Sequence, residues 1–229
     1  MRTEQVITGD NAIYILTFHG LGIPERALPD GENNYWLDPS FFEAILDCVK
    51  GRPDVRITFD DSNSSDFTIA LPALVERKLH ATFFMVSERI NQPGFVTTEQ
   101  LRTLAQSGMT IGSHGTHHRR WAQLNAGQLY EELHVSRTKL EAMLGQTVRE
   151  AACPFGSYNR RVLRGLRNAR YERVYTSDQG PAKPDEWVSA RNTVMRSHTL
   201  RDVESTLETK PHRLSGLGRM LKLTLKQWL

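Results

Sequence analysis

Residues 57–86 read ITFDDSNSSDFTIALPALVERKLHATFFMV, and this stretch decides the fold. The strand formers in 55–59 predict a buried strand. An apolar repeat over 67–79 predicts a helix, and 81–86 predicts a second strand. Two parallel strands need a long crossover between them, and a helix usually supplies it. The stretch therefore predicts one unit of a parallel α/β sheet.

The same alternation continues on both sides of this unit. Further strands are predicted over 12–18, 109–113, 150–155, 171–177 and 190–196, and further helices over 39–50, 97–108, 125–145, 159–170 and 200–208. Long loops are predicted over 21–38 and 178–190. Repeated strand–helix units predict a single domain, 1–229, folded as a distorted (β/α) barrel of about seven parallel strands.

Composition narrows the function classes. The 29 basic residues nearly balance the 26 acidic ones, for a net charge of +3, so no nucleic-acid partner is indicated. The N-terminus has no apolar run typical of a signal peptide, and no stretch approaches the ~20 apolar residues of a spanning helix. These features predict a cytoplasmic protein. They do not indicate an oligomeric state.

Residues 209–229 predict a terminal amphipathic helix with basic residues among its leucines. The favoured interpretation is a helix packed on the barrel. The alternative is a peripheral contact with an anionic membrane surface, which would place the protein at the inner membrane face.

Polar residues follow the predicted strands where each strand ends. His19 follows the first strand, Asp60 and Asp61 the second, and His114 the strand over 109–113, while Asp178 ends the strand over 171–177. In parallel α/β folds the carboxyl ends of the strands lie at one face, and functional groups collect there. These residues are therefore expected to converge.

His114 and His118 are four positions apart in SHGTHHRRW (113–121). On one helical turn both imidazoles would point to the same side, a spacing that favours two metal ligands. The alternative is a polar loop with hydrogen-bonded histidines, and His117 is expected to point elsewhere. With one carboxylate of the Asp60–Asp61 pair, the histidines form three ligands with open positions, which is typical of a catalytic metal site.

Three motifs in this order resemble those of the polysaccharide deacetylases, the nodulation-type deacetylase superfamily or carbohydrate esterase family 4. TFDDS (58–62) resembles the family's Thr-Phe-Asp-Asp-Gly, and IGSHGTHH (111–118) its His-Ser/Thr-x-x-His. CPFGSYN (153–159) resembles its third motif, Pro-Tyr/Phe-Gly. The likeness runs from about residue 55 to 178.

The resemblance implies a metal-dependent hydrolase that removes N-acetyl groups from an amino sugar of a polysaccharide or its precursor. It makes Asp60 the general base, and Asp61, His114 and His118 the ligands of a divalent metal, most often zinc, with cobalt, nickel or manganese also suited. A backbone N–H near Phe155 would stabilise the oxyanion. The implied partner is a carbohydrate.

The sequence departs from the family pattern at two places. The third motif usually carries Arg two residues before its Pro, but Ala152 stands there, and Arg191 on the last predicted strand is the candidate replacement. The usual Leu-x-His near the C-terminus is absent, while ILTFHG (15–20) has that form, as in circularly permuted members that act on poly-N-acetylglucosamine. The resemblance therefore implies that His19 is the general acid, with Asp178 as a candidate to orient or tune it.

Two alternatives stay open. The same fold and metal would suit removal of a formyl group or opening of another non-peptide amide, and a homologue without turnover would only bind a glycan. Four aromatic residues are candidates for stacking on a sugar ring, although packing is the favoured interpretation of each: Trp36, Trp121, Tyr158 and Trp187.

Overall fold

The computed structural model describes residues 12–209. Within them, eight parallel strands form one sheet in the order β10-β1-β4-β5-β6-β7-β8-β9. The strands are β1 (Tyr14–Phe18), β4 (Val55–Asp60), β5 (Ala81–Met85), β6 (Thr110–Ser113), β7 (Glu150–Ala152), β8 (Arg173–Thr176), β9 (Val188–Ala190) and β10 (Asn192–Thr193). A separate two-stranded sheet pairs β2 (Gly20–Leu21) with β3 (Trp36–Leu37). The predicted α/β class and parallel sheet are confirmed.

The two edge strands of the large sheet belong to one segment, residues 188–193. β9 pairs with β8, where Thr176 faces Ala190, and β10 pairs with β1, where Leu16 faces Asn192. Only Arg191 separates the two strands, so this segment joins both ends of the sheet and nearly closes it into a barrel. We call it the barrel seam. The predicted last strand, 190–196, is therefore shifted, and the loop predicted up to 190 is wrong from Val188 onward.

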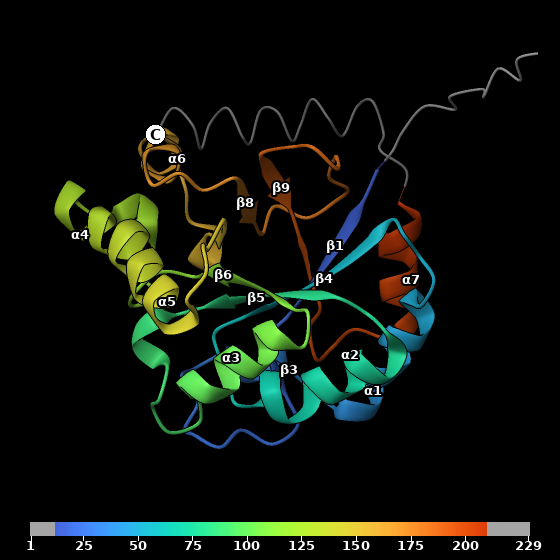
Figure 1. Ribbon diagram of the computed structural model, residues 1–229. Coiled ribbons are helices and arrows are strands. Elements are labelled where there is room, and N and C mark those ends of the chain that lie inside the picture. Colours follow the sequence, from blue (N-terminus) through green and yellow to red (C-terminus); the bar gives the residue numbers. More distant parts are fainter. Residues whose placement is uncertain (1–11, 210–229) are drawn as a thin grey trace, which may run out of the picture.

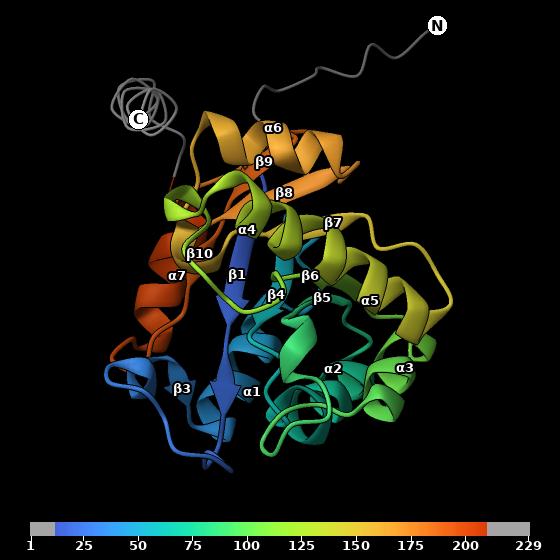
Figure 2. The ribbon, with the colours of Figure 1, turned by 90° about the vertical axis from the view of Figure 1, so that its left-hand side faces the viewer.

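Helices surround the sheet on its outside (Figures 1 and 2). They are α1 (Pro39–Val49), α2 (Leu71–Arg77), α3 (Thr98–Gln106), α4 (Ala126–Tyr130), α5 (Ser136–Leu144), α6 (Arg160–Asn168) and α7 (Leu200–Glu208). In Figure 2, α7 lies on one side of β1 and α5 on the other. Neighbouring helices contact each other at α7–α1, α1–α2, α3–α5 and α4–α6. The arrangement confirms the barrel-like fold.

The helix boundaries follow from local sequence signals. Asp38 caps α1, because its carboxylate accepts the Ser40 N–H at 2.8 Å, and Thr97 and Gln100 form a capping box for α3. Two predicted helices carry π-helical turns that the apolar repeat does not show. Residues Asp66–Ala70 precede α2, and Glu131–Val135 lie between α4 and α5. Such turns are frequent at functional sites.

Alternate residues of the strands face opposite sides of the barrel wall. Leu16, Phe59 and Phe83 belong to the large core beneath the helices, whereas Phe84 and Tyr175 belong to a smaller cluster with Ile15 and Ala152. Gly112 is required beside this smaller cluster, because a Cβ there would lie 2.5 Å from the Phe84 ring. The alternation therefore sends one residue in two toward the barrel interior.

No helix within residues 12–209 is both long and apolar enough to cross a bilayer. The terminal helix predicted over 209–229 lies, from residue 210 on, outside the described residues.

Candidate metal centre and acid–base site

The chain turns sharply at the end of β4. Asp60 is the last residue of the strand, and the next two residues, Asp61 and Ser62, have φ values of +82° and +65°. The left-handed region favours glycine, and the family motif that TFDDS resembles has glycine at the position of Ser62. Here the Ser62 hydroxyl accepts the Val86 N–H at 2.7 Å and so fixes the turn on the neighbouring strand. The turn separates two adjacent carboxylates that would otherwise repel each other.

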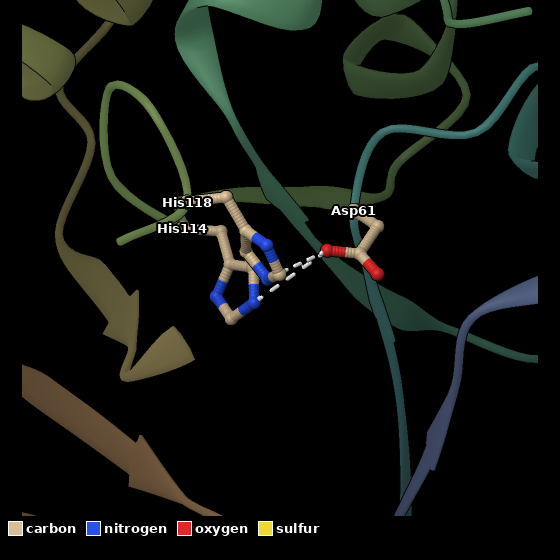
Figure 3. Close-up of side chains that lie close together, drawn as sticks. All are labelled: Asp61, His114 and His118. Atoms are coloured by element: carbon tan, nitrogen blue, oxygen red, sulfur yellow. Dashed lines mark ion pairs between the residues drawn. The ribbon is translucent and has the colours of Figure 1, made fainter. Parts of the chain in front are cut away.

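The structure brings the three predicted metal ligands together (Figure 3). One ligand atom each from Asp61, His114 and His118 lies within 4.8 Å of the others. Asp61 Oδ1 lies 3.0 Å from His118 Nε2 and 3.9 Å from His114 Nε2. They come from the ends of β4 and β6 and from the loop after β6.

These residues fit a divalent cation. Asp61 is buried, and its Oδ1 faces Nε2 of both histidines, so one carboxylate oxygen and two imidazole nitrogens form a donor set that zinc-like cations take. His114 Nδ1 lies 2.9 Å from the carbonyl oxygen of Ala152, so Nδ1–H donates to it and the lone pair of Nε2 faces both carboxylates, 3.6 Å from Asp60 Oδ2 and 3.9 Å from Asp61 Oδ1. Burial lowers the pKa of His114 to about 4, against the opposing charge of Asp60, and the ring is therefore neutral near pH 7, as a ligand must be.

The predicted helical turn between the two histidines is wrong. Residues 114–120 form an irregular loop, with φ values of +87° at Gly115 and +58° at His118. This loop brings the imidazole centroids to 5.0 Å from each other without helical geometry. His117 points elsewhere, as expected, and its Nε2 lies 3.1 Å from Glu131 Oε1.

Asp60 is paired with Arg191 inside the barrel. The two guanidinium nitrogens donate to the two carboxylate oxygens, each at 2.7 Å, and the residues are 1% and 3% exposed. Burial raises the pKa of Asp60, but the charge of Arg191 and its hydrogen bonds outweigh it and hold the pKa below its usual value. The structure thus places the candidate replacement guanidinium on the predicted base.

Ala152 explains why the guanidinium fits there. The Arg191 side chain lies over the rings of Phe84 and Tyr175, 5.2 Å and 6.0 Å from their centroids, and Ala152 belongs to the same cluster. Alanine at the family's usual arginine position leaves space beside these rings, and the side chain of Arg191 enters this space from the barrel seam.

His19 follows β1 directly, and its neighbour Phe18 faces Phe59, so His19 adjoins the position of Asp60. Its Nδ1 is buried without a hydrogen-bond partner, and its ring packs against Tyr35 at 5.0 Å between centroids. Asp178 accepts the hydroxyls of Tyr158 at 2.6 Å and Thr176 at 2.8 Å. The tuning of His19 by Asp178 stays a prediction.

Phe155 lies at the edge of the site. It has a φ of +56°, is 53% exposed, and lies 4.5 Å from the His118 ring between centroids. The Arg120 guanidinium covers the ring at 4.3 Å. Tyr158, in contrast, is 3% exposed, and its ring is part of the core, as are the buried rings of Trp36 and Trp121. Burial of these three rings favours packing, and a contact of Tyr158 with substrate stays a prediction.

Sequence reasoning missed Arg89, in a 3-10 turn after β5. Its guanidinium lies 3.1 Å from Asp61 Oδ1 and 3.3 Å from His118 Nδ1. Since arginine only donates, this contact needs a lone pair on Nδ1. A metal on Nε2 would require a proton on Nδ1, so Arg89 must turn aside when His118 binds one. No motif in the sequence points to this residue.

A buried carboxylate beside an Asp-His-His set, at the carboxyl ends of barrel strands, is typical of metal-dependent hydrolases. A family model described as polysaccharide deacetylase matches residues 49–174, more than half of the chain. The chain therefore belongs to the polysaccharide deacetylase family, and the resemblance read from the motifs is confirmed. The match includes Asp60, Asp61, His114, His118 and Phe155 and leaves out His19, Asp178 and Arg191.

Two curated relatives come from Bacillus subtilis (strain 168), and both names describe a polysaccharide deacetylase. YxkH is 30% identical over 140 residues, which cover 61% of this chain and 50% of YxkH. YheN is 29% identical over 119 residues, which cover 52% of this chain and 41% of YheN. The chain thus spans about half the length of the curated relatives it matches.

Among solved structures, the Streptococcus pyogenes deacetylase PplD in complex with acetate is similar with a TM-score of 0.76 and 22% identity. The match covers 86% of this chain and 99% of that chain. At this identity the likeness shows the fold, and it agrees with the barrel described above.

Proposed function

We propose that this chain is a metal-dependent hydrolase that removes N-acetyl groups from an amino sugar of a polysaccharide or its precursor. One observation carries the proposal: the Asp61–His114–His118 set lies beside the buried Asp60–Arg191 pair in a member of the polysaccharide deacetylase family. Zinc is the metal we expect, with cobalt, nickel or manganese as other occupants of the same ligands.

A divalent cation held by the three residues would supply Lewis acidity toward water and an amide carbonyl. Asp60 is the base in this scheme. Its low pKa keeps the carboxylate ionised near neutral pH, and a base must be ionised to accept a proton from the attacking water. Arg191 holds both carboxylate oxygens and so fixes the direction in which the base faces.

His19 would donate a proton to the leaving nitrogen. The residue directly follows β1, which pairs with the strand of Asp60, and we assign Nε2 as the proton donor because Nδ1 is buried. The Phe155 backbone, in its left-handed conformation beside His118, would provide the oxyanion donor. Base and acid would then act from neighbouring strands on one amide.

The predicted cytoplasmic location bears on the substrate. A deacetylase there would meet lipid-linked glycan intermediates or nucleotide sugars, and a peripheral membrane contact would favour the first. Both classes therefore belong in the assay beside N-acetylated oligosaccharides.

The test is acetate release from such a panel by zinc-loaded protein, by chelator-treated protein and by the Asp60→Asn variant. Asp47→Asn, at an exposed site on α1, is the matched control. We expect acetate from wild type and control only. Formate or another acid in place of acetate would support the alternative amide hydrolase. No acid from any substrate, with the metal bound, would refute turnover and support a glycan-binding role.

A further inference from the structure

The loop that carries His118 has little regular structure of its own. Residues 114–120 follow β6, and the 3-10 turn Trp121–Gln123 precedes α4. Two of its residues, Gly115 and His118, have left-handed backbone conformations. A loop with this backbone needs contacts from outside to keep one conformation.

A buried carboxylate provides these contacts. Glu132 is fully buried, and Oε2 accepts the Thr116 N–H at 3.0 Å and the indole N–H of Trp121 at 3.3 Å. Oε1 accepts the His117 N–H at 3.1 Å. Two of the three donors are backbone groups immediately before His118. Burial of a carboxylate is costly unless it is hydrogen-bonded, and here the loop supplies the donors.

The π-helical turn Glu131–Val135 aims Glu132 at the loop. The preceding residue, Glu131, contacts the same loop from the solvent side, through His117 Nε2 at 3.1 Å and the Arg119 guanidinium at 3.2 Å. Gly115 lets the carboxylate approach, because a Cβ there would lie 2.3 Å from Glu132 Oε2. The π-helical turn that carries Glu132 and the absence of a side chain at Gly115 thus support the same contact, that of the Glu132 carboxylate with the loop.

We propose that Glu132 is a positioning residue for the metal centre. Its carboxylate fixes the backbone of residues 116–117, and this fixes the place from which His118 reaches Asp61 and His114. The inference rests on the proposed metal site and adds a residue that lies on a different element and touches none of the three ligands' side chains. It predicts that metal affinity depends on Glu132 even where the protein remains folded.

The test measures the zinc dissociation constant by competition with a chromophoric chelator. Glu132→Gln keeps the size of the side chain but turns one acceptor into an N–H donor that faces a loop N–H. We expect zinc binding to weaken by about 10–100-fold, the range for residues that support metal ligands. Glu99→Gln, which makes the same change at an exposed position on α3 away from the loop, is the matched control and should bind zinc as wild type does.

Circular dichroism and thermal melting in chelator establish which variants are folded. If Glu132→Gln does not fold, Glu132→Asp decides the matter, because it keeps the charge but withdraws the carboxylate from the loop N–H groups by one methylene, and it should weaken zinc binding as well. Wild-type zinc affinity in a folded Glu132→Gln or Glu132→Asp variant would overturn the positioning role alone. Absence of zinc binding by the wild-type protein would overturn the proposed function too.

Discussion

Replacement of Arg191 by methionine tests the pairing on which the proposed base depends. Methionine retains much of the apolar volume between Phe84 and Tyr175 but leaves the Asp60 carboxylate buried without its guanidinium. Removal of one partner of a buried ion pair costs about 3–5 kcal/mol. For a chain of this size, each kcal/mol lowers Tm by about 2–4 °C, so we expect a fall of roughly 6–20 °C.

The pH dependence of this loss has a definite sign. Because the folded protein holds the pKa of Asp60 below that of the unfolded chain, the pair stabilises the fold above the unfolded pKa. This contribution is lost as the pH falls through the lower folded pKa. The Tm difference between wild type and Arg191→Met should therefore be full at pH 7 and shrink below about pH 4, the unfolded value for aspartate.

A second variant separates the pairing from general damage to the core. Ala152→Arg combined with Arg191→Met returns a guanidinium to the position that the family usually uses, into the space that Arg191 leaves. We expect partial recovery of both Tm at pH 7 and acetate release. Thermal melting followed by circular dichroism and the acetate assay measure the two effects. A Tm for Arg191→Met within 2 °C of wild type at pH 7, by this same scale, would refute the reasoning.

Three further predictions concern stability in the presence of chelator. Burial, together with the charges of Asp61 and Asp60, raises the pKa of Asp66 well above its usual value, and its Oδ1 has no hydrogen-bond partner. Asp66→Asn should therefore raise Tm at pH 7 but not below about pH 4, where the unfolded chain is protonated too. An equal gain in Tm at both pH values would contradict this. The pKa of His114 is lowered to about 4, so between pH 7 and pH 5 only the unfolded chain takes up a proton there, and the free energy of unfolding should fall by about 2 kcal/mol. In urea unfolding, His114→Asn should show a smaller dependence of this free energy on pH. An unchanged dependence would argue against a buried neutral ring. Thr97→Ala removes the capping box of α3 and should cost about 1 kcal/mol, seen as a Tm lower by about 2–4 °C with unchanged zinc binding.

The strand–helix alternation made most of the fold predictable. Strands such as 55–59 and 81–86 are long enough for their composition to be recognised, and the caps Asp38 and Thr97 mark the helix starts. The barrel seam was only partly predictable, because β9 and β10 have three and two residues and follow a proline-containing loop. Strands so short carry almost no periodic signal.

The candidate site was predictable where a residue type and its position along a strand are sufficient. Asp60, Asp61 and His114 stand at or directly after the ends of strands, and the absence of arginine at Ala152 pointed to Arg191. Positions set by the backbone could not be read in this way. The loop of His118 depends on left-handed residues and on a π-helical turn, and neither leaves a recognisable pattern in a single sequence.

The barrel seam also has a consequence for synthesis of the chain. Asp60 emerges from the ribosome before its partner, which lies 131 residues later on the segment that joins the two ends of the sheet. At 5–20 residues per second, the ribosome needs on the order of 10 s to make that interval. During this time the nascent chain holds Asp60, and from residue 118 onward also the three candidate metal ligands, but not the guanidinium that pairs with Asp60. The Asp60–Arg191 pair is therefore assembled only when translation has passed the seam, and a chain truncated before Val188 would carry the candidate ligands without the guanidinium that holds Asp60.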